Sequence, residues 1–114
     1  KGSTGAPSET WAGITMNMSS AFSFTNQGKV KMKIYSNHTG AVVKFKLENP
    51  STGTTTETDV LTTVANGWEE LTFNMDPSVI GRSFGGFSIF YEFGLAGNGS
   101  ANFIGYFDDI KIYP

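Results

Sequence analysis

The feature that most constrains the fold is an alternation of apolar and charged side chains between Lys29 and Glu48. Its two halves read KVKMKIYS and AVVKFKLE, and the apolar positions are Val30, Met32, Ile34, Ala41, Val43, Phe45 and Leu47. A period of two is the strand period, because successive side chains point to opposite faces of a sheet. The turn-like segment Ser36–Gly40 predicts that the halves form an antiparallel hairpin with one apolar and one charged face.

The rest of the chain divides into short segments of the same kind. The other predicted strands are Trp11–Met18, Ser20–Phe24, Thr55–Val64, Trp68–Met75, Phe87–Phe93 and Asn102–Tyr113. Turn signals such as Asn66-Gly67 separate them, and no window has a useful helix period. About eight short strands predict an all-β fold, an antiparallel β-sandwich of jelly-roll type in two sheets. The length of 114 residues predicts one domain over residues 1–114.

Composition excludes several functions. A net charge of −2 gives no general attraction to nucleic acid or to an anionic membrane, so we expect neither as a partner. The absence of cysteine excludes disulfides and zinc-thiolate sites. No apolar run is long enough to span a bilayer, and if the protein is exported we expect its signal peptide upstream of Lys1.

The basic residues are unevenly distributed. Five of the eight lysines and arginines fall on the predicted outer face of the hairpin, namely Lys29, Lys31, Lys33, Lys44 and Lys46. A solvated face kept soluble by lysine is the simpler interpretation, and lysine also discourages pairing between sheet edges. A polyanionic ligand is the alternative.

The order of motifs along the chain resembles a known family. The motifs are ETWAG, VKMKIYS, VVKFKLEN, TTVANGWEELTFNM, FSIFYEFG and YFDDIKI, and together they cover Glu9–Tyr113. They resemble the jelly-roll carbohydrate-binding modules of secreted bacterial glycoside hydrolases and polysaccharide lyases. The resemblance implies a secreted, non-catalytic module that holds the catalytic domain of the same polypeptide near a plant or algal polysaccharide.

The chain departs from that family at its start. Modules of this appearance carry about forty further residues before the Trp-Ala-Gly stretch, with at least one strand and an acidic calcium ligand. The chain therefore resembles a module without its N-terminal strand. We expect an uncovered sheet edge, or another segment or molecule in that place.

Asp108-Asp109 is the paired carboxylate of the sequence. Neighbouring strand residues point in opposite directions, so the two do not suit a hydrolytic pair. By alternation Asp108 shares the face of Ile110 and Ile112, where a buried carboxylate needs a cation or several donors. The resemblance implies structural calcium at this place, with Asp108 and the adjacent Asp109 as candidate ligands. A strand-end aspartate that accepts hydrogen bonds from loop amides is the alternative.

Three aromatic residues are candidates for stacking on a sugar ring. Trp11 follows a polar loop, where stacking and packing are equally compatible with the sequence. Trp68 opens a strand after Asn66-Gly67, where packing is favoured. Tyr91 lies in a strand that is aromatic on both faces, so it can reach a binding face.

Polar candidates accompany these rings. Tyr35 beside Lys33, with Lys44 on the same predicted face, would suit a sugar that bears carboxylates or sulfates. Arg82, the only arginine, could hold a carboxylate or a hydroxyl pair, although a surface salt bridge is favoured. The only histidine, His38, is expected to be exposed in the hairpin turn.

Two other functions are compatible with the sequence. A structural or adhesion β-domain, used as a spacer or in surface attachment, needs no sugar site. A small lyase that uses tyrosine, lysine and arginine is the catalytic alternative, but no nucleophile motif supports catalysis. We therefore expect a binding module and not an enzyme.

Overall fold

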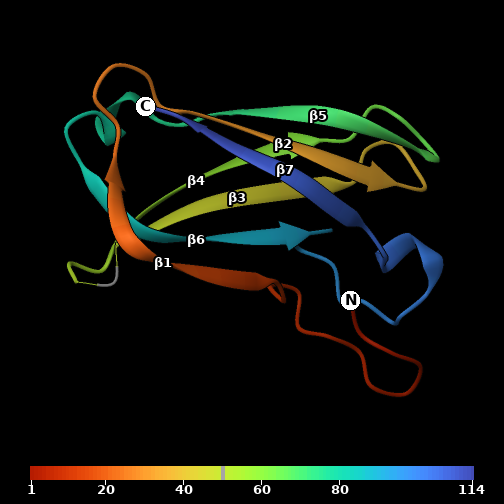
Figure 1. The fold of residues 1–114 in the computed structure, drawn as a ribbon. Coiled ribbons are helices and arrows are strands. Elements are labelled where there is room, and N and C mark those ends of the chain that lie inside the picture. The colour runs from red at the N-terminus through yellow and green to blue at the C-terminus, as the bar shows by residue number, and fades with distance from the viewer. Residues whose placement is uncertain (50) are drawn as a thin grey trace.

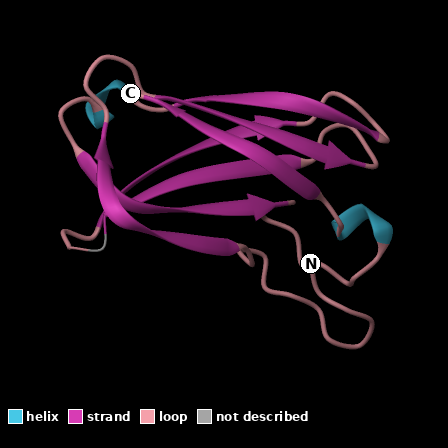
Figure 2. Cartoon of the chain, in the orientation of Figure 1, coloured by secondary structure: helices cyan, strands magenta, loops and turns pink. Residues whose placement is uncertain are grey.

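The chain is a β-sandwich of jelly-roll type, seen in a computed structural model that describes residues 1–49 and 51–114 (Figures 1 and 2). The described residues contain seven strands, where the sequence predicts about eight. The strands are β1 (Ile14–Ser23), β2 (Lys29–Ser36), β3 (Val42–Asn49), β4 (Thr54–Leu61), β5 (Gly67–Asn74), β6 (Ser83–Tyr91) and β7 (Tyr106–Tyr113). Two short 3₁₀ helices span Pro77–Val79 and Ala101–Phe103, and no helix in the described ranges is long and apolar enough to cross a membrane.

The strands form two antiparallel sheets of unequal width. The wider sheet has the order β1-β6-β3-β4, and the narrower sheet has the order β5-β2-β7. On one flank β4 lies beside β5, where the Thr58 hydroxyl donates to the Asn74 carbonyl at 3.2 Å. On the same flank, the Glu69 carboxylate of β5 accepts hydrogen bonds from the backbone N–H groups of Thr63 and Val64, which follow β4. Figure 1 shows β7 on the opposite flank, toward β6 and β1.

The predicted hairpin between Lys29 and Glu48 is wrong. β2 pairs with β5 and β7, whereas β3 pairs with β4 and β6, so the two strands belong to different sheets. The intervening segment crosses from one sheet to the other, with Gly40 in the left-handed region at φ 79°. Both strands turn apolar faces toward the interior between the sheets. The same alternation fits a hairpin and a crossover, because it reports the inward face of a strand and not its neighbours.

The predicted inward faces of these strands are confirmed. Val30, Ile34, Phe45 and Leu47 are buried in the core, at most 2% exposed. Phe45 lies at the centre, with its ring 5.1 Å from that of Phe87 on β6 and 5.5 Å from that of Phe73 on β5 (centroid distances). The contact with Phe73 joins the two sheets, and the contact with Phe87 lies within the wider sheet.

The N-terminal part of the chain differs from its prediction in detail. β1 is one strand from Ile14, where the sequence predicts two strands beginning at Trp11. Its pairing with β6 changes register between Asn17 and Phe22, so the strand bends without ending. Trp11 lies outside the strand, in a turn.

Candidate functional site

Three aromatic side chains lie side by side on the outer face of the narrower sheet. Tyr35 of β2 is directly opposite Trp68 of β5 and directly opposite Tyr106 of β7. Its ring centroid is 5.9 Å from that of Trp68 and 6.0 Å from that of Tyr106, both edge to face. Trp68 is 53% exposed and Tyr106 58% exposed. We call these three residues the aromatic row.

Local structure fixes the two ends of the aromatic row. Asn66 has a φ of 56°, and its N–H donates to the Ser36 carbonyl at 2.8 Å, so the turn before β5 places Trp68 beside the end of β2. Before β7, a side chain at Gly105 would lie 3.1 Å from the Tyr91 ring. The glycine therefore lets the chain pass close to Tyr91 and begin β7 with Tyr106 directed outward.

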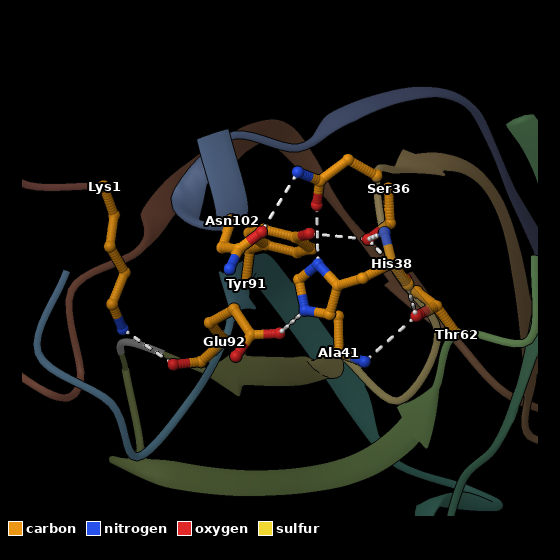
Figure 3. Close-up of polar contacts among 9 residues, drawn as sticks. Lys1, Ser36, His38, Ala41, Thr62, Tyr91, Glu92 and Asn102 are labelled. Atoms are coloured by element: carbon orange, nitrogen blue, oxygen red, sulfur yellow. Dashed lines mark hydrogen bonds and ion pairs between the residues drawn. The ribbon is translucent and has the colours of Figure 1, made fainter. Parts of the chain in front are cut away.

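A cluster of polar side chains anchors the end of β2 that carries Tyr35 (Figure 3). The Ser36 hydroxyl and the Tyr91 phenol form a hydrogen bond of 2.7 Å, and burial raises the pKa of Tyr91. His38 Nε2 lies 3.0 Å from the Glu92 carboxylate, which is buried, and His38 Nδ1 lies 2.6 Å from the Asn37 side-chain oxygen. His38 is half-buried in this cluster, so its expected exposure in a hairpin turn is wrong.

Charged residues occupy the outer face next to the aromatic row. Lys33 is opposite Glu70 on β5 and opposite Asp108 on β7. Its ammonium lies 3.1 Å from the Asp109 carboxylate, while Lys31 lies 3.5 Å from Glu70. Acidic partners from the flanking strands therefore accompany Lys31 and Lys33.

The five lysines that were expected on one face are divided between the two sheets. Lys29, Lys31 and Lys33 belong to β2, whereas Lys44 and Lys46 belong to β3 on the other side of the molecule. Lys44 is only 7% exposed, and its ammonium lies 2.7 Å from Glu57 and 3.5 Å from Asp59. Desolvation lowers the pKa of Lys44, but the hydrogen bond to Glu57 and the nearby acids outweigh it, so the pKa is raised. Lys44 is thus a paired residue far from the aromatic row.

The other candidates are also dispersed. Trp11, 62% exposed, precedes β1 and does not belong to the narrower sheet. Arg82 precedes β6 at the other end of the sandwich, where its guanidinium lies 5.3 Å from the Phe84 ring centroid. Tyr91 points to the interior and bonds Ser36. Of the seven sugar-binding candidates, the structure brings together Tyr35, Trp68 and Lys33.

The expected buried position of Asp108 is wrong. Lys31 and Lys33, two residues apart, are opposite Lys111 and Asp108, which are three apart. The extra residue is a β-bulge, and Asp109 has a φ of 59° within it. The bulge reverses the alternation, so Asp108 shares the outer face with Lys33 and is exposed.

The two aspartates do not fit a calcium site. Calcium requires six to eight oxygen ligands. Asp108 accepts the Asp109 N–H at 2.7 Å, and Asp109 lies 3.1 Å from Lys33 and 3.8 Å from Lys111. Over residues 1–49 and 51–114, no group of three or more acidic, histidine or cysteine residues is arranged to hold a metal ion. The ammonium groups of Lys33 and Lys111 supply the positive charge next to Asp109.

The ion pair between Lys33 and Asp109 leads to a titration prediction. The hydrogen bond from Lys33, assisted by the charge of Lys111, lowers the pKa of the Asp109 carboxyl, and the same hydrogen bond raises the pKa of Lys33. In the Lys33→Met variant, the Asp109 pKa should rise toward its ordinary value, as NMR of the side-chain carboxyl carbon would measure. Because the pKa of Asp109 is lower in the folded state than in the unfolded state, its ion pair with Lys33 stabilises the fold above the unfolded-state pKa. This stabilisation is lost as the pH falls through the folded-state pKa of Asp109. An unchanged Asp109 pKa in this variant would contradict the ion pair.

No protein-family model matches this chain, and no curated protein matches it significantly.

Proposed function

We propose that this domain is a non-catalytic carbohydrate-binding module whose binding face is the aromatic row. The observation that carries the proposal is the alignment of Trp68, Tyr35 and Tyr106 across three strands on an exposed face. Isolated exposed aromatic residues are common on protein surfaces, but three adjacent ones form a continuous apolar patch that calls for an explanation.

A sugar chain suits this patch because each pyranose ring has an apolar C–H face and a rim of hydroxyl groups. The aromatic rings cover the C–H faces, while nearby polar side chains can exchange hydrogen bonds with the hydroxyls. Lys33 and Asp108 provide a donor and an acceptor in the next cross-strand position. With few contacts per chain, we expect a Kd on the order of micromolar to millimolar.

The charge pattern favours a neutral β-glycan over an anionic polysaccharide. Lys33 and Lys31, the lysines nearest to the aromatic row along β2, both have acidic partners. A sulfated or uronate chain would meet Glu70, Asp108 and Asp109 as well as the ammonium groups, and would have to compete with these carboxylates.

The biological role that we propose follows from weak, non-catalytic binding. Such a module would hold the catalytic domain of the same secreted bacterial polypeptide near a plant or algal polysaccharide. When the module and the catalytic domain both bind the same insoluble polysaccharide, the effective concentration of the catalytic domain at its substrate rises, while the reaction that it catalyses is unchanged.

Affinity gel electrophoresis with a panel of soluble polysaccharides tests the proposal. We expect neutral β-glucans, xylans or mannans to retard the protein, and we expect alginate and sulfated galactans to have less effect. A parallel incubation checks the same polysaccharides for released reducing ends or unsaturated products, which should not appear. Uniform mobility across the panel would favour a structural spacer, and product release would contradict the non-catalytic assignment.

A further inference from the structure

His38 is held in its polar cluster by contacts at both ring nitrogens (Figure 3). Nδ1 lies 2.6 Å from the side-chain oxygen of Asn37, and Nε2 lies 3.0 Å from the carboxylate of Glu92. Both of these oxygens are hydrogen-bond acceptors. A neutral imidazole donates from only one nitrogen, whereas the imidazolium ion donates from both. The surroundings of His38 therefore fit its protonated form.

A second hydrogen bond directs the oxygen of the Asn37 amide toward His38. The side-chain nitrogen of Asn37 donates to the side-chain oxygen of Asn102 at 3.1 Å. Because its nitrogen is engaged there, Asn37 can offer a donor to a neutral His38 only if its amide turns over. That rotation would place the Asn37 oxygen against the Asn102 oxygen unless the Asn102 amide turned as well. The protonation state of His38 is therefore linked to the contact between Asn37 and Asn102.

Glu92, the other partner of His38, is held in place by the fold. Its backbone has a φ of 54°, which is uncommon for a residue other than glycine, and strain of this kind concentrates at functional sites. The Lys1 ammonium donates to the Glu92 carbonyl at 2.9 Å. The Glu92 residue is only 6% exposed, and a buried carboxylate needs a donor or a positive charge. Protonated His38 supplies both.

Other titratable groups adjoin the cluster from two parts of the chain. The end of β6 contributes the phenol of Tyr91 and the carboxylate of Glu92. The N-terminal segment contributes Lys1, whose side-chain ammonium bonds the Glu92 carbonyl and whose α-amino group bonds the Phe103 carbonyl. Histidine is the side chain that ordinarily changes charge between pH 5 and 8, and His38 is the only histidine of the chain. Since the α-amino group also titrates in this range, variants of the cluster that retain Lys1 are needed to isolate the effect of His38.

The cluster connects the chain segments next to two rings of the aromatic row. Tyr35 lies shortly before Asn37 and His38, at the end of β2. Asn102 belongs to the short helix Ala101–Phe103, shortly before Tyr106 at the start of β7. The hydrogen bond between Asn37 and Asn102 therefore ties the segment that follows Tyr35 to the segment that precedes Tyr106.

We propose that His38 is a positioning residue for the aromatic row, and that its protonated form holds the row in the arrangement that binds ligand. This regulation rests on the proposed sugar binding at the same face. When His38 loses its proton, Asn37 loses a charge-assisted hydrogen bond, and its contact with Asn102 is exchanged or broken. Ligand binding must then also order the segment before Tyr106, which lowers the affinity. The affinity is therefore highest where His38 is charged and falls as the pH rises through its titration.

Titration calorimetry with soluble β-glucan, xylan and mannan, at about pH 5.5 and about pH 8, tests the proposal. For a polysaccharide that binds, we expect the Kd to be about fivefold higher at the higher pH. Asn102→Ala removes the contact with Asn37 and retains His38 and Glu92, so its Kd should be the same at both pH values. His38→Gln, whose side chain cannot change charge, should lose the pH dependence as well. Nitrogen-15 NMR should show a proton on both ring nitrogens of His38 at the lower pH.

The outcomes distinguish this proposal from the proposed function. Binding of none of the three polysaccharides at either pH would overturn the proposed function and its regulation together. Binding with the same Kd at both pH values would overturn the regulation alone, as would an unchanged pH dependence in Asn102→Ala or a single ring proton on His38 at the lower pH. Asn102 is exposed, so its truncation tests the connection in a folded protein even if His38→Gln impairs folding.

Discussion

Replacing Trp68 by alanine is expected to weaken polysaccharide binding by about tenfold or more. The indole is the largest ring of the aromatic row, and it is half exposed, so its face is available to a sugar. If stacking buries roughly 60 Å² of apolar surface, the loss is about 1.5 kcal/mol, which corresponds to about tenfold in Kd. Isothermal titration calorimetry with the polysaccharide that retards the protein most strongly would measure the change.

Trp11→Ala is the matched control for this prediction. Trp11, at 62%, is somewhat more exposed than Trp68, but it lies outside the narrower sheet, so its loss should leave the affinity within about twofold. Tyr106→Ala should weaken binding in the same direction as Trp68→Ala, because it removes the other end of the aromatic row. An equal loss in the two tryptophan variants, or none in either, would count against the aromatic row as the binding face.

The interior of this fold could be predicted from the sequence to a large extent. Alternation identifies the inward apolar residues of β2 and β3 correctly, because inward and outward positions differ in hydrophobicity, but it does not predict the burial of the outward-facing Lys44. It does not identify which strands pair. In a sandwich, a crossover between sheets and a hairpin within one sheet produce the same pattern, and Ser36–Gly40 suits either connection.

The aromatic row was less accessible to sequence analysis because it depends on strand pairing and on one bulge. Tyr35 and Trp68 could be named as candidates but not placed opposite each other. Because Ile110 faces inward, regular alternation would predict that Asp108 and Tyr106 face inward as well. The bulge at Asp109 shifts the alternation by one residue, so both side chains face outward. The Asp-Asp pair before an alternating apolar segment was the available signal, since aspartate is one of the few non-glycine residues that adopts a positive φ readily.

The apolar inner face of β1 is exposed, since Ile14 and Met16 pair with β6 beside buried residues yet remain 43% and 44% exposed. The sequence alone could not locate this surface. Apolar alternation in β1 predicts a buried face whether or not a covering strand is present.

Replacing Phe45 by alanine is expected to destabilise the domain more than any substitution on its surface. The side chain is fully buried at the centre of the sandwich, where its ring contacts Phe73 of the narrower sheet and Phe87 of its own, wider sheet. Truncation of a buried phenylalanine costs about 3–5 kcal/mol, because the transfer free energy is lost and a cavity is left behind. At about 4 °C per kcal/mol for a domain of this size, the melting temperature should fall by roughly 12–20 °C.

Phe107→Ala provides a control with the same change in chemistry. Phe107 points toward the interior, but it is 39% exposed on the flank of the sandwich where β7 lies, so its truncation should cost roughly a third to a half as much as that of Phe45. Calorimetric or circular-dichroism melting of both variants would measure the difference. Equal losses would mean that this flank is as well packed as the centre, which would contradict the distribution of buried side chains on which the sandwich and the exposed inner face of β1 both depend.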